Sequence, residues 1–236
     1  MALVEIQALT KVYRQDELET HALRGIDLAM DEGEFAALEG PSGSGKTTLL
    51  NVIGGLDTST AGRVAIDGRD LSTMSAAELS DYRLVHIGFV FQAYNLVPVL
   101  TALENVEFIM VLQGRSPAES RLRALHYLER VGLEALAHRR PKALSGGQQQ
   151  RVAVARALAA GPRLVLADEP TANLDSETAQ GLLELMGELN EEEGMTFLFS
   201  THDVRVMERA RRVITLKDGR VSEDRLQGQG MGHAAL

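Results

Sequence analysis

A glycine-rich stretch, residues 40–47, has the residue types and spacing of a loop that binds phosphate groups. Its sequence GPSGSGKT ends in Lys46 and Thr47, where a helix is expected to begin. Backbone N–H groups in such a loop point inward, and the positive end of the helix adds to their attraction for a polyphosphate. The lysine ammonium can reach the β- and γ-phosphates, and the threonine hydroxyl can bind Mg²⁺. We therefore predict a nucleotide site formed by Gly40, Pro41, Ser42, Gly43, Ser44, Gly45, Lys46, Thr47 and Thr48.

The segments on both sides of this loop fit the same interpretation. Residues 34–39 form a short, mostly apolar run that is typical of a buried strand, and residues 47–53 form an apolar helix ended by two glycines. A strand, a loop and a helix in this order are what a phosphate-binding loop requires.

Two further runs typical of buried strands end in residues that can carry chemistry. Asp168 and Glu169 end the run 164–169, and His202 follows the run 195–200. If the first of these strands lies beside the loop strand, Asp168 would bind Mg²⁺ and Glu169 would orient a water molecule. A solvated strand end and a structural histidine are the alternatives on position alone. The phosphate loop favours the catalytic interpretation, with His202 near the γ-phosphate.

A second phosphate contact is predicted at residues 145–148. Ser145 and Gln148 form a capping box that opens a helix, and Gly146 and Gly147 occupy its first turn. An apolar core stripe explains the later residues of this helix but not two glycines, each of which costs about 1 kcal/mol relative to alanine in a helix. Glycine is useful there if a ligand or another backbone approaches closely.

Composition limits the class of protein. The 236 residues are 44% hydrophobic and contain no cysteine, which excludes disulfides and thiolate metal sites. We find neither an uncharged apolar stretch long enough to span a membrane nor the pattern of a secretory signal, so a cytoplasmic location is expected. The net charge of −9 argues against broad nucleic-acid binding.

The remaining elements suggest one α/β domain with a helical insertion. Alternating residues predict strands over 4–13 and 22–30, and capping boxes predict helices beginning after Ser75 and Thr101. The pattern changes from strands to helices between about 93 and 160. We therefore expect a nucleotide-binding core over 1–92 and 161–227, an inserted helical subdomain over 93–160, and a loose tail over 228–236.

Taken together, these motifs resemble those of the ATP-binding subunits of ABC transporters. The resemblance extends from about residue 4 to residue 223 and rests on LSGGQ at 144–148, Gln92, LVLADE at 164–169, NLD at 173–175 and His202. Within the family, FVFQAYNLVP at 89–98 and GGQQQR at 146–151 resemble the branch of lipoprotein release, macrolide-type efflux and a related cell-division ATPase. The fold implied is a RecA-like P-loop NTPase core with an antiparallel β layer and an inserted helical subdomain.

The resemblance implies a role for each matching residue. Glu169 would polarise the attacking water, His202 would steady the γ-phosphate, and Gln92 would sense Mg²⁺ and the water. Lys46 would act on the phosphates, and Thr47, Gln92 and Asp168 would surround the metal. Further nucleotide contacts would come from Tyr13, stacked on adenine, and from the signature and D-loop residues, Ser145, Gly146, Gly147, Gln148 and Asp175. Packing at a strand end is the alternative for Tyr13.

The family also implies partners. Two copies would face head to tail, so that ATP on the loop of one is covered by residues 145–148 of the other. Separate membrane permease subunits would contact the helical subdomain near residues 92–104, placing the protein on the inner face of the cell membrane. An apolar group there is either this docking surface or a local core: Tyr94, Leu96, Val97, Val99 and Leu100. The competing function is a soluble ABC-type ATPase acting on DNA or ribosomes, whose relatives usually carry coiled-coil insertions or two nucleotide domains.

Overall fold

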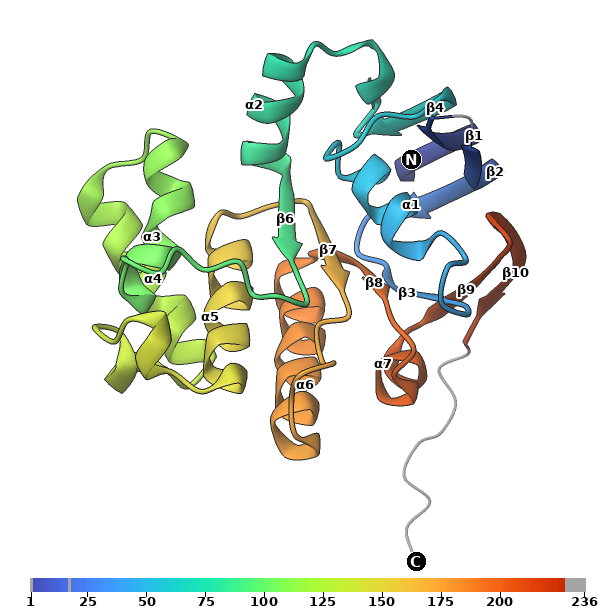
Figure 1. Ribbon diagram of the computed structural model, residues 1–236. Coiled ribbons are helices and arrows are strands. Elements are labelled where there is room, and N and C mark those ends of the chain that lie inside the picture. Colours follow the sequence, from blue (N-terminus) through green and yellow to red (C-terminus); the bar gives the residue numbers. More distant parts are fainter. Residues whose placement is uncertain (1, 17, 228–236) are drawn as a thin grey trace, which may run out of the picture.

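The structure is a computed structural model that describes residues 2–16 and 18–227. Its strands form two sheets, one of four strands and one of six. Figure 1 shows the four-stranded sheet and the helices α3, α4 and α5 at opposite ends of the molecule, with the six-stranded sheet between them. The tail predicted over residues 228–236 lies outside the described residues.

The four-stranded sheet is antiparallel and contains both strands predicted before the phosphate loop. Its order is β2 (Leu18–Asp31), β1 (Ala2–Gln15), β4 (Ala61–Ile66) and β5 (Arg69–Asp70). The two long strands exceed the predicted ranges. Their alternation is imperfect because the pairing shifts register between Ile6 and Leu9, where Ala8 has a φ of 45°.

The six-stranded sheet carries the strands whose ends were predicted to be functional. Its order is β10 (Arg220–Leu226), β9 (Arg212–Lys217), β3 (Phe35–Glu39), β8 (Thr196–Ser200), β7 (Leu164–Asp168) and β6 (Ile87–Val90). Only β10 pairs antiparallel. The condition that the strand before Glu169 lies beside the loop strand is therefore wrong, because β8 separates β7 from β3.

Helices cover the two faces of this sheet and create two cores. On one face α1 (Lys46–Ile53) packs against the antiparallel sheet through Leu49 and Ile53. The other core joins Phe197 and Phe199 of β8 to the long helix α6 (Ser176–Glu193) and to the inserted helices. Those are α3 (Ala102–Leu112), α4 (Pro117–Arg130) and α5 (Gly146–Ala159), which pack on one another.

The predicted capping boxes are confirmed. The side chains of Ser75, Thr101 and Ser145 each accept a hydrogen bond from the backbone N–H three residues later. The helix opened by Ser75 is α2 (Ala76–His86). A short helix that was not predicted, α7 (Val204–Arg209), follows the loop after β8.

Candidate nucleotide-binding site

The phosphate loop leaves β3 at Glu39 and enters α1 at Lys46, as predicted. Two of its glycines occupy positions that have no room for a side chain. A Cβ atom on Gly40 would lie 2.1 Å from the carbonyl oxygen of Leu216, and one on Gly45 would lie 2.6 Å from that of Ala22. Both glycines also have a positive φ, of 146° and 105°. The loop can therefore curl only because these positions lack a side chain.

The side chains of Lys46 and Thr47 are both held by hydrogen bonds at the phosphate loop. The ammonium of Lys46 donates to the carbonyl oxygens of Gly40, at 2.7 Å, and Pro41, at 3.3 Å. The hydroxyl of Thr47 lies 3.3 Å from a carboxylate oxygen of Asp168, although β8 separates β7 from β3, the strand before the loop. The loop after β3 thus brings Thr47, at the start of α1, to the end of β7.

A cavity of about 650 Å³ opens beside the loop. Most of the predicted site residues line it: Gly40, Pro41, Ser42, Gly43, Gly45, Lys46, Thr47, Thr48, Gln92, Glu169 and His202. The predicted loop residue Ser44 is buried and is not among the lining residues. The structure thus gathers residues from the ends of β3, β6, β7 and β8 around one space large enough for a nucleotide.

Sequence reasoning missed four lining residues, Thr20, His21, Ala22 and Ser200. The first three belong to a part of β2 that lies outside or at the edge of the predicted strand, so no pattern marked them. The hydroxyl of Ser200 is buried and has no hydrogen-bond partner among the described residues. Ser200 ends a buried strand two residues before His202, and this position in the sequence could have identified it as a residue of the site.

Glu169 and His202 form a pair at the ends of β7 and β8. The carboxylate of Glu169 lies 2.8 Å from Nδ1 of His202 and accepts a hydrogen bond of 3.3 Å from the hydroxyl of Thr201. The glutamate side chain is only 16% exposed, whereas the histidine side chain is 76% exposed. Glu169 has a φ of 48°, a region that non-glycine residues occupy at a cost of roughly 1–2 kcal/mol. Glu169 lines the cavity, and its contacts with Thr201 and His202 hold its carboxylate there.

The loop that carries His202 is held by a charge network on its other side. Asp203 caps α7 and accepts hydrogen bonds from Arg205, at 2.7 Å, and from the hydroxyl of Thr171, at 2.7 Å. The hydrogen bonds from Arg205 outweigh desolvation and, with that from Thr171, lower the pKa of Asp203 to about 2. An ionised Asp203 thus anchors the loop between His202 and α7.

The segment around Gln92 connects the cavity with the inserted helices. The backbone carbonyl of Gln92 accepts a hydrogen bond of 3.1 Å from the amide of Asn173. Two residues further, Tyr94 and Asn95 adopt positive φ angles, and their carbonyl oxygens accept hydrogen bonds of 2.8 and 2.6 Å from Arg156 of α5. Burial lowers the pKa of Arg156. Contacts from two directions therefore hold this segment.

The predicted second phosphate contact, residues 145–148, does not line the cavity in the described chain. Its capping box is formed by Ser145 and Gln148. The two glycines have neighbours within the chain: a Cβ atom on Gly146 would lie 2.8 Å from the hydroxyl of Tyr94, and one on Gly147 would lie 3.0 Å from a methyl of Thr178. Close packing thus supplies part of the reason for these glycines, beyond the ligand approach that the sequence suggested.

Two other predicted nucleotide contacts, Asp175 and Tyr13, also lie outside the lining of the cavity. Asp175 caps α6 and accepts a hydrogen bond of 3.0 Å from the backbone N–H of Thr178, which lowers the pKa of its carboxyl group. Tyr13 lies in β1 opposite Thr20, which does line the cavity. The tyrosine is therefore a near neighbour of the site.

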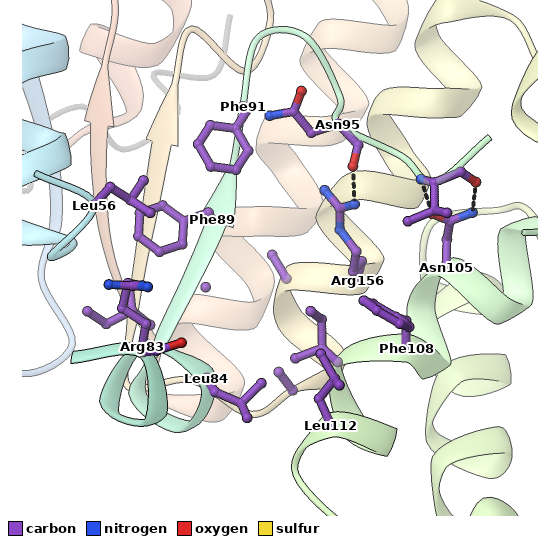
Figure 2. Close-up of a pocket in the computed structure, with 17 residues that line it drawn as sticks. Leu56, Arg83, Leu84, Phe89, Phe91, Asn95, Asn105, Phe108, Leu112 and Arg156 are labelled. Carbon is purple, nitrogen blue, oxygen red and sulfur yellow. Dashed lines mark hydrogen bonds between the residues drawn. The ribbon is translucent and has the colours of Figure 1, made fainter. Parts of the chain in front are cut away.

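A second cavity, of about 570 Å³, lies between the core and the inserted helices (Figure 2). Its walls include Leu56, Phe89 and Phe91 on one side and Phe108 and Leu112 of α3 on the other. Ten of its lining residues are labelled in Figure 2, and two of them, Arg83 and Arg156, are cationic. None of the residues that line it is acidic. We call this space the interlobe groove.

Two features are absent from residues 2–16 and 18–227. No helix there is long and apolar enough to cross a membrane. No group of three or more histidine, cysteine, aspartate or glutamate side chains in the same ranges could hold a metal ion.

Comparison with known proteins agrees with these features. The family model described as ABC transporter matches residues 23–172. The chain is 47% identical over 231 residues to the ABC transporter ATP-binding protein MJ0796 of Methanocaldococcus jannaschii, covering 96% of this chain and 98% of that protein. It is 49% identical over 222 residues to the lipoprotein-releasing system ATP-binding protein LolD of Anaeromyxobacter dehalogenans, covering 94% of this chain and 93% of that protein.

A solved structure resembles the whole described fold. It is the dimeric, post-hydrolysis state of the MJ0796 cassette bound to ADP and phosphate, with a TM-score of 0.90 and 46% identity, and the match covers 95% of this chain and 99% of that one. The P-loop NTPase fold predicted from the resemblance is thus confirmed. From its family and its site, the chain belongs to the ABC transporters, as an ATP-binding and ATP-hydrolysing subunit.

Proposed function

We propose that ATP binds in the 650 Å³ cavity with its phosphates on the loop 40–48. The observation that carries this proposal is the convergence on one space of Lys46 from the start of α1 and of Glu169 and His202 from the ends of β7 and β8. The lysine ammonium has three donors and uses two of them on loop carbonyls, which leaves it able to donate to a phosphate oxygen. The loop N–H groups and the start of α1 supply the remaining attraction.

Mg²⁺ fits the oxygen atoms beside the loop. The hydroxyl of Thr47 and the carboxylate of Asp168 lie 3.3 Å apart, and both are the hard ligands that this ion prefers. Few protein ligands are needed, because Mg²⁺ keeps several waters and binds phosphate oxygens as well. When bound there, it would neutralise charge on the β- and γ-phosphates. Gln92 lines the same cavity and is proposed to contact the metal and the water.

Hydrolysis is proposed to depend on the pair at the ends of β7 and β8. Glu169 orients the attacking water and accepts one of its protons as the water oxygen bonds to the γ-phosphorus, so that inorganic phosphate forms. The bond from that phosphorus to the bridging oxygen breaks, and ADP leaves with the charge on its β-phosphate. His202 donates to the γ-phosphate oxygens once it turns from Glu169, and its 76% exposed side chain leaves room for this movement. Positioning and electrostatics thus account for the rate enhancement.

A second copy of the chain is proposed to complete the site. Residues 145–148 present a helix start away from this chain's own cavity, and the MJ0796 cassette is dimeric in its structure. In a head-to-tail dimer this helix start, with Asp175 nearby, would face the γ-phosphate on the other copy. Loss of the phosphate would remove the contact that favours the closed dimer. Two ATP molecules would thereby drive closing and opening.

The interlobe groove is proposed to receive a helix of a membrane permease subunit. Exposed apolar side chains border it on α3, with Phe108 41% and Leu112 53% exposed. Because its lining includes two guanidinium groups and no carboxylate, the occupant we propose is an apolar helix that carries an acidic residue. Of the apolar group predicted to be either the docking surface or a local core, Val97 lines the groove, Leu96 packs against the core, and Val99 is 70% exposed.

This docking would hold the protein on the inner face of the cell membrane. The resemblance to LolD supports an output of the lipoprotein-release or export type. The competing proposal, a soluble ATPase that acts on DNA or ribosomes, is not favoured by either relative. Within the proposed arrangement, residues 93–160 act as the inserted subdomain between the nucleotide cavity and the permease.

Co-purification from solubilised membranes tests the docking. We expect a tagged full-length chain to recover a membrane protein, and Phe108→Asp to reduce that recovery strongly. Leu122→Asp is the matched control, because Leu122 is 74% exposed on α4 and does not line the groove. ATP binding by the purified variants, measured in parallel, reports that they are folded. Recovery of nucleic acid without any membrane protein would contradict the proposal.

A further inference from the structure

Beside the nucleotide cavity, Lys11 is a buried cation that contacts three groups at once. Its side chain is 11% exposed. The ammonium lies 2.6 Å from a carboxylate oxygen of Asp57 and 2.8 Å from the carbonyl oxygen of Thr58. It also lies 4.8 Å from the centre of the Tyr13 ring, within the range of a cation–π contact. We refer to Lys11, Asp57 and Tyr13 as the tyrosine brace.

The brace fixes Tyr13 at two places. Its hydroxyl donates a hydrogen bond of 2.8 Å to the second carboxylate oxygen of Asp57, and the ammonium of Lys11 lies over its ring. The tyrosine nevertheless remains 42% exposed. An aromatic ring that is held so firmly and yet remains exposed is suited to stacking on a ligand.

The brace also links two elements beside the nucleotide cavity, strand β1 and the segment that follows α1. Tyr13 lies directly opposite Thr20 in the antiparallel pair, so both side chains stand on the same face of the sheet, and Thr20 lines the cavity. Asp57 follows shortly after α1, the helix that begins with Lys46 at the phosphate loop. The group that fixes the ring is thus attached to the element that holds the phosphates.

The electrostatics of the brace agree with an ion pair. Burial alone would raise the pKa of the Asp57 carboxyl group, but hydrogen bonds from Lys11 and Tyr13 outweigh that effect and lower it. Burial, followed by the hydrogen bond to Asp57, raises the pKa of the Tyr13 hydroxyl, so it stays a donor at neutral pH. The carboxylate thus remains charged between the lysine and the tyrosine.

We propose that Lys11 and Asp57 are positioning residues, which hold the Tyr13 ring ready to stack on the base of ATP. This inference rests on the proposed binding of ATP in the neighbouring cavity. Two effects contribute: the ring loses little freedom on binding, and the cation on one face makes the ring a better partner for an electron-rich purine on the other. Ordering one side chain in advance is worth about a three- to tenfold gain in affinity.

A purely structural ion pair would behave differently, and a ligand without a base separates the two cases. Inorganic tripolyphosphate needs the phosphate loop but has nothing to stack on Tyr13. The measurement is therefore the affinity of the full-length chain, with Mg²⁺, for the β,γ-imido analogue of ATP and for tripolyphosphate. Calorimetric titration gives both affinities for each variant.

Lys11→Met keeps the length of the side chain and removes its charge. We expect it to weaken binding of the ATP analogue about three- to tenfold and to change tripolyphosphate binding less than about twofold. Asp57→Asn is expected to act in the same direction, and Lys11→Arg to retain most of the affinity. In a chain that already carries Tyr13→Ala, Lys11→Met is expected to cause no further loss, because the ring through which it acts is gone.

Equal weakening of both ligands by Lys11→Met would overturn the brace and leave a structural ion pair. If Tyr13→Ala weakened binding of the ATP analogue but Lys11→Met did not, the positioning role of Lys11 and Asp57 would also be rejected. The stacking role of Tyr13 would then remain. If Tyr13→Ala left the ratio of the two affinities unchanged, the stacking role itself would fail. If Lys11→Met does not fold, Tyr13→Phe removes only the hydrogen bond to Asp57, and the same ratio decides the question.

Discussion

Replacing Glu169 with glutamine tests the proposed chemistry most directly. The variant keeps the size of the side chain and one oxygen that can accept from His202, at the 2.8 Å separation seen here. It removes the negative charge, and its amide group cannot accept the hydrogen bond from Thr201 that the second carboxylate oxygen receives. The loss is therefore confined to the group that is proposed to polarise the water.

The expected magnitude follows from the position of this carboxylate. It is 16% exposed, lines the cavity and is held by contacts with Thr201 and His202, so it is preorganised there. Removing one preorganised catalytic group typically costs about 2.7–4 kcal/mol of transition-state stabilisation, or about 10²–10³ in turnover. ATP binding should persist, because Lys46 and Thr47 make no hydrogen bond to Glu169 among the described residues.

Phosphate release gives the turnover number, and sedimentation with ATP gives the state of assembly. We expect Glu169→Gln to sediment as a dimer with ATP, because it would retain the nucleotide that is proposed to hold two copies together. Thr201→Val is the matched control, because it removes the hydrogen bond to Glu169 and keeps the carboxylate. It should lose less activity, about tenfold at most. Hydrolysis by Glu169→Gln at close to the wild-type rate would refute the assignment of Glu169.

Three further predictions concern the loop and the support of His202. Lys46→Ala should weaken ATP binding itself, and an unchanged dissociation constant in calorimetric titration would remove the loop from the proposal. Gly40→Ala should lower the melting temperature strongly, because its Cβ would meet the carbonyl oxygen of Leu216 at 2.1 Å; an unchanged thermal scan would contradict this packing. Hydrogen bonds from Arg205 lower the pKa of Asp203 from 3.8 to about 2 in the folded state, so its contribution is complete above pH 3.8 and is lost as the pH falls toward 2. The free energy of unfolding should therefore fall more steeply over that range in the wild type than in Asp203→Asn, as denaturant titrations at several pH values can show.

The sequence indicated the elements well where local patterns carry the information. Apolar runs ended by Asp168, Glu169 and His202 predicted buried strands with functional ends, because parallel strands bring their carboxyl ends to one edge of a sheet. Capping boxes at Ser75 and Thr101 placed helix starts correctly, because the partner of each cap lies only three residues away.

Features that depend on distant parts of the chain were not predicted. The position of β8 between β3 and β7 follows from how whole strands pack, and no local pattern encodes it. Ala8 breaks the alternation of β1 through a register shift that only the paired strand reveals. The contact between Lys11 and Asp57 joins residues 46 positions apart in the sequence. The role proposed for this pair also depends on a third residue, Tyr13, which contacts both of them.

The segment that begins at Gln92 gives the nucleotide cavity and the interlobe groove a common structural element. Gln92 lines the cavity, and Asn95, three residues later, lines the groove. Arg156 lines the groove as well, and it donates a hydrogen bond of 2.6 Å to the carbonyl oxygen of Asn95. Figure 2 marks this bond with a dashed line. A helix that places a carboxylate against Arg156 would compete with these carbonyl bonds and could release the segment. Because a change at either end must be accommodated by the few residues between them, the state of the ATP site and the occupancy of the groove are expected to influence each other equally.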